Sequence, residues 1–236
     1  MLSHDNIVWT SKVAIRNYGL EKRNFRVLSY LPLSHVAGQM FDIHAPIILQ
    51  GCTYFADKNV MKGSLIDNLQ WCRPTAFLGV PRVWEKVKDL SRYCYTYLLT
   101  FCVQVMEKML EKAREIKGLK KKISREAKKV GLKCNTEDKQ TTMFKVFQKI
   151  YYTKVKTLLG LDHCNLFVTG AAPISREVVD YFMSLDIKLT ELYGMSESTG
   201  YHTGNLPGKI KFGSVGVNTD ITVKSKLVKV RPSMAL

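Results

Sequence analysis

Short apolar runs alternate along this chain with longer segments in which an apolar residue returns every three or four positions. The short runs are bounded by Gly or Pro, which is typical of buried strands. We expect strands at residues 26–30, 52–55, 75–78, 165–169 and 187–193. Regular alternation of strands and helices predicts an α/β fold with a largely parallel sheet flanked by helices.

The longer segments predict helices over residues 37–49, 64–71 and 107–130. Pro46 should kink or end the first of these, since it lacks an N–H and its ring clashes with the preceding turn. Ser175 is a suitable N-cap for a helix over 176–185, with Glu177 in its first turn.

Two glycines, Gly170 and Gly194, directly follow predicted strands. Ligands of parallel sheets bind beyond the carboxyl ends of the strands, and backbone without a side chain lets them approach closely. The placement of these glycines therefore predicts a nucleotide site at one edge of the sheet.

The segment 193–200, YGMSESTG, groups an aromatic ring, hydroxyls and one carboxylate within eight positions. A ring can stack on a base, and a carboxylate is the kind of oxygen ligand that Mg²⁺ prefers. The alternative is a strand-to-helix turn in which Glu197 faces the positive end of a helix dipole.

This segment closely resembles the signature of adenylate-forming enzymes, Y-G-x-[ST]-E. Residues 166–174, LFVTGAAPI, resemble the adenine-side loop of the same superfamily, and residues 30–38, YLPLSHVAG, resemble its L-P-L-x-H motif. With residues 79–86, GVPRVWEK, the ordered set is similar to an AMP-binding acyl-CoA synthetase of the bubblegum type. The resemblance covers roughly 1–86 and 106–216.

The resemblance implies an enzyme that activates a long-chain fatty acid with ATP and CoA through an acyl-adenylate. Glu197 would hold Mg²⁺ and Ser196 would contact phosphate. His35 would orient the fatty-acid carboxylate, unless it is an ordinary histidine at a strand end. The remaining residues that the resemblance assigns to the adenylate are Gly170, Ala171, Ala172, Pro173, Tyr193 and Gly194.

The residues after His35 carry a second implication of the resemblance, an acyl tunnel. Ala37, Gly38, Met40 and Phe41 would line it, although the same residues would suit an ordinary core. Gln39 stands where some relatives carry an aromatic gate.

The chain also departs from the family pattern. The Gly- and Thr-rich phosphate loop is expected immediately before Met1, and the C-terminal domain is expected after residue 216. The sequence therefore predicts a partial AMP-binding domain over 1–216, truncated at both ends, with an insertion at 87–105 and a divergent tail at 217–236. We expect such a chain to be catalytically impaired by itself.

Hydrophobic residues make up 46% of the 236 positions, enough for a substantial core. None of the six cysteines forms a C-x-x-C pair, which favours free thiols in a reducing compartment. No secretory leader or spanning apolar run is evident, so we expect a soluble cytoplasmic protein.

The formal net charge is +16, and residues 108–133 contribute +8 of it, with eleven Lys or Arg and three Glu. Such a segment is a solvated basic face or a contact for anionic membrane, including that of the endoplasmic reticulum. Its few aromatic residues argue against nucleic acid, which charge alone would allow. A non-catalytic fragment that binds adenylate, a partner or membrane through this segment is the alternative function.

Overall fold

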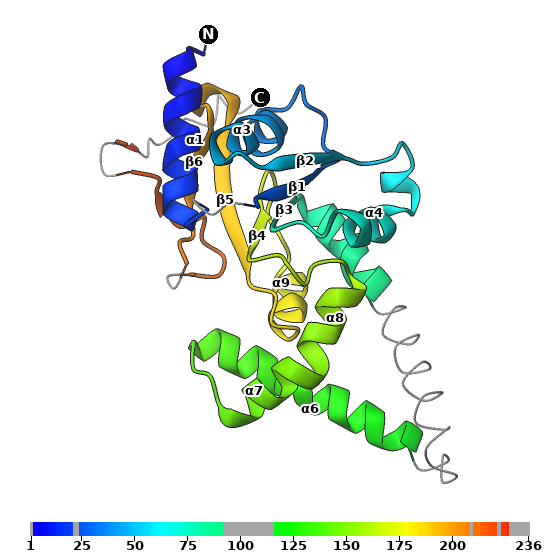
Figure 1. Cartoon of the computed structure of the whole chain (residues 1–236). Coiled ribbons are helices and arrows are strands. Elements are labelled where there is room, and N and C mark those ends of the chain that lie inside the picture. The colour runs from blue at the N-terminus through cyan, green and yellow to red at the C-terminus, as the bar shows by residue number, and fades with distance from the viewer. Residues whose placement is uncertain (1, 21–23, 92–115, 208–209, 221–222, 227–236) are drawn as a thin grey trace, which may run out of the picture.

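The computed structural model describes residues 2–20, 24–91, 116–207, 210–220 and 223–226, with the side chains of 116–121 left out (Figure 1). Its main sheet has the strand order β3 (Ala76–Gly79), β4 (Leu166–Thr169), β5 (Leu189–Met195), β6 (Gly200–Gly204) and β7 (Val217–Asn218). The first three strands are parallel, with Phe77 opposite Phe167 and Phe167 opposite Leu189. A separate parallel pair joins β1 (Arg26–Ser29) to β2 (Cys52–Phe55).

The α/β class and the five predicted strands are confirmed, but the sheet has an antiparallel edge that sequence reasoning missed. β6 and β7 run antiparallel to their neighbours, and β7 begins at the expected boundary of the divergent tail. β6 is GYHTG and β7 has only two residues, so neither carries the apolar run that marks a buried strand.

Helices cover the two sheets. Helix α1 (His4–Tyr18), also not predicted, begins with a capping box at Ser3 and ends at Gly19, whose φ is 62°. Helix α4 (Leu65–Cys72) follows the 3₁₀ turn η2 (Val60–Lys62), residues 81–91 are helical, and α9 (Arg176–Met183) is capped by Ser175 as predicted.

Pro46 does not end the helix that contains it. Residues 36–49 run through α2 (Val36–Gly38), the π-helical η1 (Gln39–His44) and α3 (Ala45–Leu49). The Ala45 N–H bonds to the Met40 carbonyl, five residues back, and Thr53 Oγ1 donates to the Asp42 carbonyl at 2.6 Å. The wider turn and the threonine thus compensate for the N–H that proline lacks.

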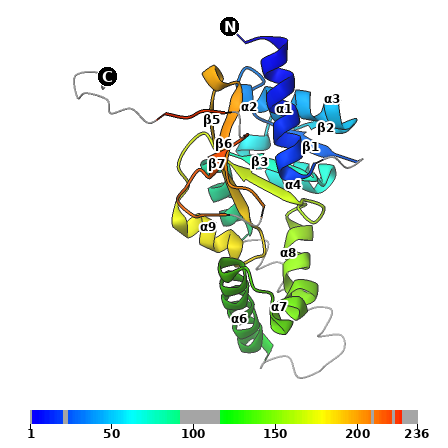
Figure 2. The ribbon, with the colours of Figure 1, turned by 90° about the vertical axis from the view of Figure 1, so that its left-hand side faces the viewer.

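Four further helices form a helical arm, which we define as residues 116–158. It comprises α6 (Ile116–Glu137), α7 (Thr142–Phe147), the π-helical η3 (Gln148–Tyr152) and α8 (Thr153–Leu158). Figures 1 and 2 both show α6 and α7 at the end of the molecule away from β1 and β2. Of the predicted helix over 107–130, residues 107–115 lie outside the described residues.

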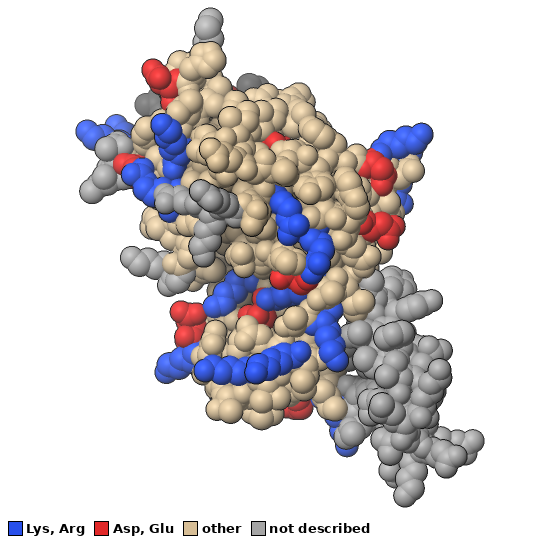
Figure 3. All heavy atoms as spheres, viewed as in Figure 1, with Lys and Arg blue, Asp and Glu red and all other residues tan. Residues whose placement is uncertain are grey.

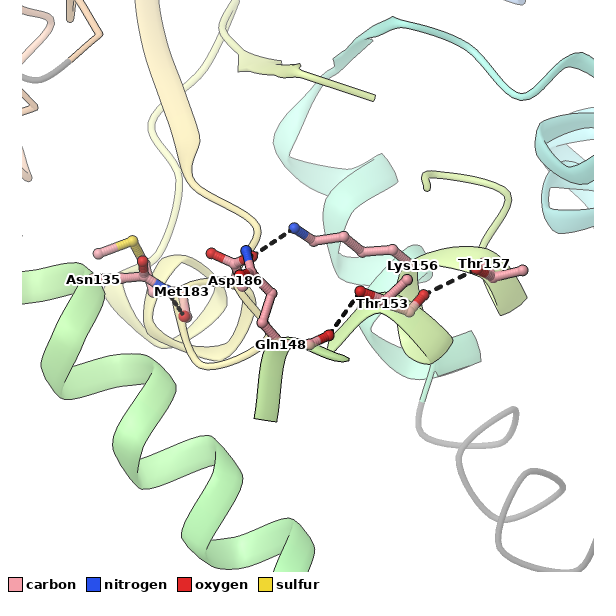
Figure 4. Close-up of polar contacts among 7 residues, drawn as sticks. All are labelled: Asn135, Gln148, Thr153, Lys156, Thr157, Met183 and Asp186. Atoms are coloured by element: carbon pink, nitrogen blue, oxygen red, sulfur yellow. Dashed lines mark hydrogen bonds and ion pairs between the residues drawn. The ribbon is translucent and has the colours of Figure 1, made fainter. Parts of the chain in front are cut away.

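The arm is fixed to the sheet region by polar and apolar contacts. Asn135 Nδ2 donates to the Met183 carbonyl at 2.8 Å, and Lys156 Nζ lies 2.8 Å from Asp186 Oδ2 (Figure 4). The buried side chains Phe144 and Tyr152 belong to the same core cluster as Trp84, which is fully buried. Arm and sheet therefore share one hydrophobic core.

The proposed insertion at 87–105 falls only partly within the described chain. Residues 87–91 continue the helix that starts at 81, with Val87 and Ser91 buried. Lys88 Nζ contacts Glu177 at 2.6 Å and so ties this helix to α9. Residues 92–105 lie outside the described residues.

Candidate functional site

A cavity of about 720 Å³ lies between α1, the helix over 36–49 and the main sheet. Much of its wall is apolar, with side chains contributed by α1, by the helix over 36–49 and by the main sheet. The apolar lining includes Ala14, Ile15, Met40, Phe41, Leu166 and Val168. Of the residues expected to line an acyl tunnel, Gly38 is not among the lining residues and is buried against Pro32. Gln39, at the expected gate position, does not line the cavity either, and its Nε2 donates to the Leu33 carbonyl at 2.9 Å.

The predicted site residues meet at the same cavity. Those that line it are His35, Gly170, Ala171, Tyr193, Gly194, Ser196 and Glu197. Ala172 and Pro173 are exposed and do not belong to the lining. Three motifs far apart in the sequence thus converge on one apolar-to-polar cavity.

The YGMSESTG segment is the end of a strand followed directly by a short 3₁₀ turn. β5 continues through Gly194 to Met195, and Glu197 lies in a single 3₁₀ turn, η4 (Ser196–Ser198). The expectation that Gly194 directly follows a strand is therefore wrong. A Cβ at Gly194 would collide with the Gly200 carbonyl, so this glycine is what allows β6 to fold back against β5.

Hydrogen bonds fix the turn that presents Glu197. Ser198 Oγ lies 3.1 Å from the Met195 carbonyl and 3.2 Å from the Gly200 carbonyl, bracketing η4. Thr199 then adopts a left-handed φ of 61° and Gly200 a φ of 91°. The neighbouring Ser196 and Glu197 are exposed at the cavity. Ser198 therefore holds the turn together, whereas Ser196 is accessible to a ligand.

The residues at this turn fit a magnesium ion that is also held by phosphate. Within the described ranges, no group of three or more His, Cys, Asp or Glu side chains could hold a metal by itself. Glu197 supplies a single exposed carboxylate and takes part in none of the ion pairs found among the described residues. Mg²⁺ commonly binds through one or two carboxylates plus substrate phosphates, which is the environment this site offers.

His35 is the N-cap of α2 and not merely a residue at a strand end. Its Nδ1 accepts a hydrogen bond from the Ala37 N–H at 3.1 Å. The neutral ring therefore carries its proton at Nε2, and this atom is left to donate to a ligand.

Tyr193 and Ala171 also line the cavity, near the other residues of the predicted site. The Tyr193 ring is 44% exposed and meets His202 edge-on, with ring centroids 6.2 Å apart. Ala171 has a φ of 67°, a conformation that costs an alanine about 1–2 kcal/mol. A strained residue at a cavity edge is consistent with a ligand site.

Sequence reasoning missed a partly buried tyrosine pair in the cavity wall. The hydroxyls of Tyr18 and Tyr201 lie 3.0 Å apart, and Tyr18 also donates to the Asn205 carbonyl at 3.1 Å. Burial, reinforced by Tyr201, raises the pKa of the Tyr18 hydroxyl, which therefore stays neutral. Only the periodicity of α1 could have placed Tyr18 here, and that helix was not predicted.

A second titratable group, Asp42, belongs to the helix over 36–49 that forms one wall of the cavity. Burial raises the pKa of the Asp42 carboxyl from 3.8 to about 6, although a hydrogen bond with Ser29 opposes the shift. Asp42 is 5% exposed and its Oδ2 has no hydrogen-bond partner in the part of the chain that the structure describes. Its ionised form is therefore costly.

Comparisons with known proteins agree with this geometry. The profile of the AMP-binding enzyme family matches residues 1–231, so the chain belongs to that family. It is 43% identical over 225 residues to the long-chain-fatty-acid--CoA ligase ACSBG2 of Gallus gallus, covering 92% of this chain and 27% of that protein. It is 34% identical to the ligase heimdall of Drosophila melanogaster, covering 87% and 29%.

Solved structures share the fold at low sequence identity. The anthranilate CoA ligase AuaEII, solved with anthranoyl-AMP, has a TM-score of 0.55 at 12% identity and covers 92% of this chain. Apo MatB from Rhodopseudomonas palustris has a TM-score of 0.53 at 19% identity. The chain spans about 30% of either neighbour's length.

Proposed function

We propose that this chain supplies the acyl- and adenylate-binding part of a long-chain fatty-acid–CoA ligase, whose substrates are ATP, a long-chain fatty acid and CoA. The observation that carries the proposal is the cavity, because one space joins an apolar wall to the three motifs at the strand ends. An acyl-adenylate has the same two halves, a hydrocarbon chain and a nucleotide phosphate.

In this proposal the chain acts by positioning and not by covalent chemistry. His35 donates from Nε2 to the carboxylate of the fatty acid, and Ser196 donates to the α-phosphate. Tyr193 packs on the adenine beside the Gly170–Ala171 backbone, with Ala172 and Pro173 completing the loop. The apolar wall holds the acyl chain and excludes water from the reacting carboxylate.

Glu197 is proposed to hold Mg²⁺ together with the phosphates, as the fit of its lone carboxylate supports. When bound, the ion neutralises phosphate charge during attack on the α-phosphate. Glu197→Gln removes the charge of the carboxylate and keeps its shape. The loss of ligand binding that it causes should therefore depend on added Mg²⁺. Glu137→Gln, on exposed α6, is the matched control.

We further propose that the chain binds adenylate but turns over slowly by itself. This follows from the chain's length, since it spans only 27% of the ACSBG2 ligase of Gallus gallus that it matches. Assays of oleoyl-CoA formation should therefore show little activity, and rates typical of enzymes would contradict this part of the proposal.

The binding part is tested by thermal unfolding with a long-chain acyl-sulfamoyl adenosine, a non-hydrolysable analogue of acyl-adenylate. A ligand that binds only the folded state at about 100 times its dissociation constant stabilises it by about 2.7 kcal/mol. A raised midpoint in the wild type and in Glu137→Gln supports the proposal. An unchanged midpoint at saturating analogue overturns it.

A cytoplasmic location is also part of the proposal. Within the described ranges, no helix is long and apolar enough to cross a bilayer. The four described cysteines, of which Cys72, Cys134 and Cys164 are buried, are free thiols, as a reducing compartment favours. Selective thiol labelling before and after lysis in a cell would test this location.

A further inference from the structure

The helical arm carries an exposed apolar stripe on α7 and η3. Met143, Val146 and Ile150 are 54%, 45% and 51% exposed. Their spacing of three and four residues places them on one side of the helix. The opposite side is buried through Phe144, Phe147, Tyr151 and Tyr152. The buried face thus already has its partner, and the stripe is a second apolar face.

The orientation of this stripe is fixed by the core beneath it. Tyr152 is fully buried, and its hydroxyl donates to the Ala127 carbonyl of α6 at 2.5 Å. Thr141 caps α7 by accepting from the Phe144 N–H at 3.2 Å. The helix cannot rotate to bury the stripe without breaking these contacts.

Positive charge borders the stripe. Residues 139–160 contain no Asp or Glu, and Lys145, Lys149 and Lys154 are exposed. No ion pair neutralises these three lysines among the residues that the structure describes, whereas Lys156 is paired with Asp186. Figure 3 shows basic side chains running across the lower part of the molecule, where the arm lies. An apolar stripe bordered by lysines is complementary to an anionic lipid surface.

We propose that α7 and η3 form a membrane-docking face, with Met143, Val146 and Ile150 entering the headgroup–acyl boundary of an anionic bilayer and the bordering lysines contacting its phosphates. This face is distinct from the cavity and from the basic segment 108–133. Membrane contact therefore depends on an apolar stripe as well as on charge.

The experiment is flotation of the full chain with phosphatidylcholine vesicles with and without about 30 mol% phosphatidylserine. Wild type should float with the anionic vesicles, and binding should weaken as salt rises. Met143→Ser/Val146→Ser/Ile150→Ser should lower the bound-to-free ratio roughly tenfold. The control variant Val8→Ser/Ile47→Ser/Phe55→Ser removes three exposed apolar side chains elsewhere and should bind as wild type does.

Two further variants separate the stripe from the charge of α6. Lys145→Glu/Lys149→Glu should abolish flotation, whereas Lys122→Glu/Lys133→Glu, on exposed α6 positions, should reduce it less than about twofold. Ile150→Trp keeps the apolar face and should strengthen binding, because tryptophan prefers the interface. Equal loss from both charge pairs, unchanged flotation of the serine variant, or no flotation of wild type would overturn the proposal.

Discussion

The cavity is assembled from elements between α1 and β6, whereas the docking face of the arm comes from one continuous stretch, α7 and η3. Convergence of distant segments requires special backbone, such as Gly194 beneath Gly200 and the left-handed Thr199. A helix surface requires only the right spacing of apolar and basic side chains. Sites of the first kind therefore leave short motifs in a sequence, and sites of the second kind do not.

The largest expected effect comes from Trp84, a fully buried residue of the core that the sheet and the arm share. Trp84 donates from Nε1 to the Val168 carbonyl at 3.1 Å, and its ring packs edge-on against Phe182 of α9. Trp84→Ala should lower the free energy of unfolding by about 3–5 kcal/mol in urea denaturation. If sheet and arm were independent, a separate arm transition would survive the substitution.

Trp71 is the matched control for that substitution. Its side chain is 64% exposed and touches Tyr54 edge-on. Trp71→Ala should cost less than about 1 kcal/mol. An equal loss from both substitutions would contradict the core assignment of Trp84.

The next effect concerns the helix that forms one wall of the cavity. Because the folded-state pKa of Asp42 lies above its unfolded value, the protein gains stability as pH falls from about 7 through 6 toward 3.8. Asp42→Asn should therefore stabilise the protein at about pH 7 by on the order of 2–3 kcal/mol, and less at about pH 5. Chemical denaturation at both pH values measures this. Asp67→Asn, at an exposed position of α4, is the matched control.

A cavity-filling substitution separates ligand binding from docking. Ala14 of α1 lines the cavity, so Ala14→Phe should weaken binding of a dodecanoyl-adenylate analogue roughly thirtyfold while leaving vesicle flotation unchanged. Val8→Phe on the exposed side of the same helix should change neither. Calorimetric titration and flotation of the same samples decide the matter. Parallel loss of both activities would mean that the two regions are coupled.

The smallest effect is expected within the arm. Tyr152→Phe removes the buried hydrogen bond to the Ala127 carbonyl and should cost about 1 kcal/mol in thermal unfolding. Tyr54→Phe, at a half-buried position, should cost less than about 0.5 kcal/mol. A neutral Tyr152→Phe would mean that this bond does not hold η3 against α6.

The sequence predicted those parts whose signal is local. Strands β1 to β5 contain apolar runs, and Ser175 is a recognisable N-cap, so their positions followed from pattern alone. The course of residues 36–49 was not predictable from Pro46. The hydroxyl of Thr53, which bonds to the Asp42 carbonyl, belongs to strand β2, and no pattern within residues 36–49 predicts that contact.

The candidate site was predictable in its polar half and less so in its apolar half. The motifs identified His35, Gly170, Tyr193 and Glu197, all of which line the cavity. The contribution of α1 was missed, because residues such as Ala14 become part of the wall only when that helix packs against the sheet. The stripe on α7 was missed for the same reason, since exposure is a tertiary property.

The central claim is that one cavity holds both halves of an acyl-adenylate. It is tested most directly by calorimetric titration of the wild-type chain with dodecanoyl- and acetyl-sulfamoyl adenosine. Each buried methylene contributes about 0.8 kcal/mol, so even partial burial predicts that the dodecanoyl compound binds at least roughly 100-fold more tightly. Equal dissociation constants would mean that the apolar wall does not receive the acyl chain, and would contradict the claim.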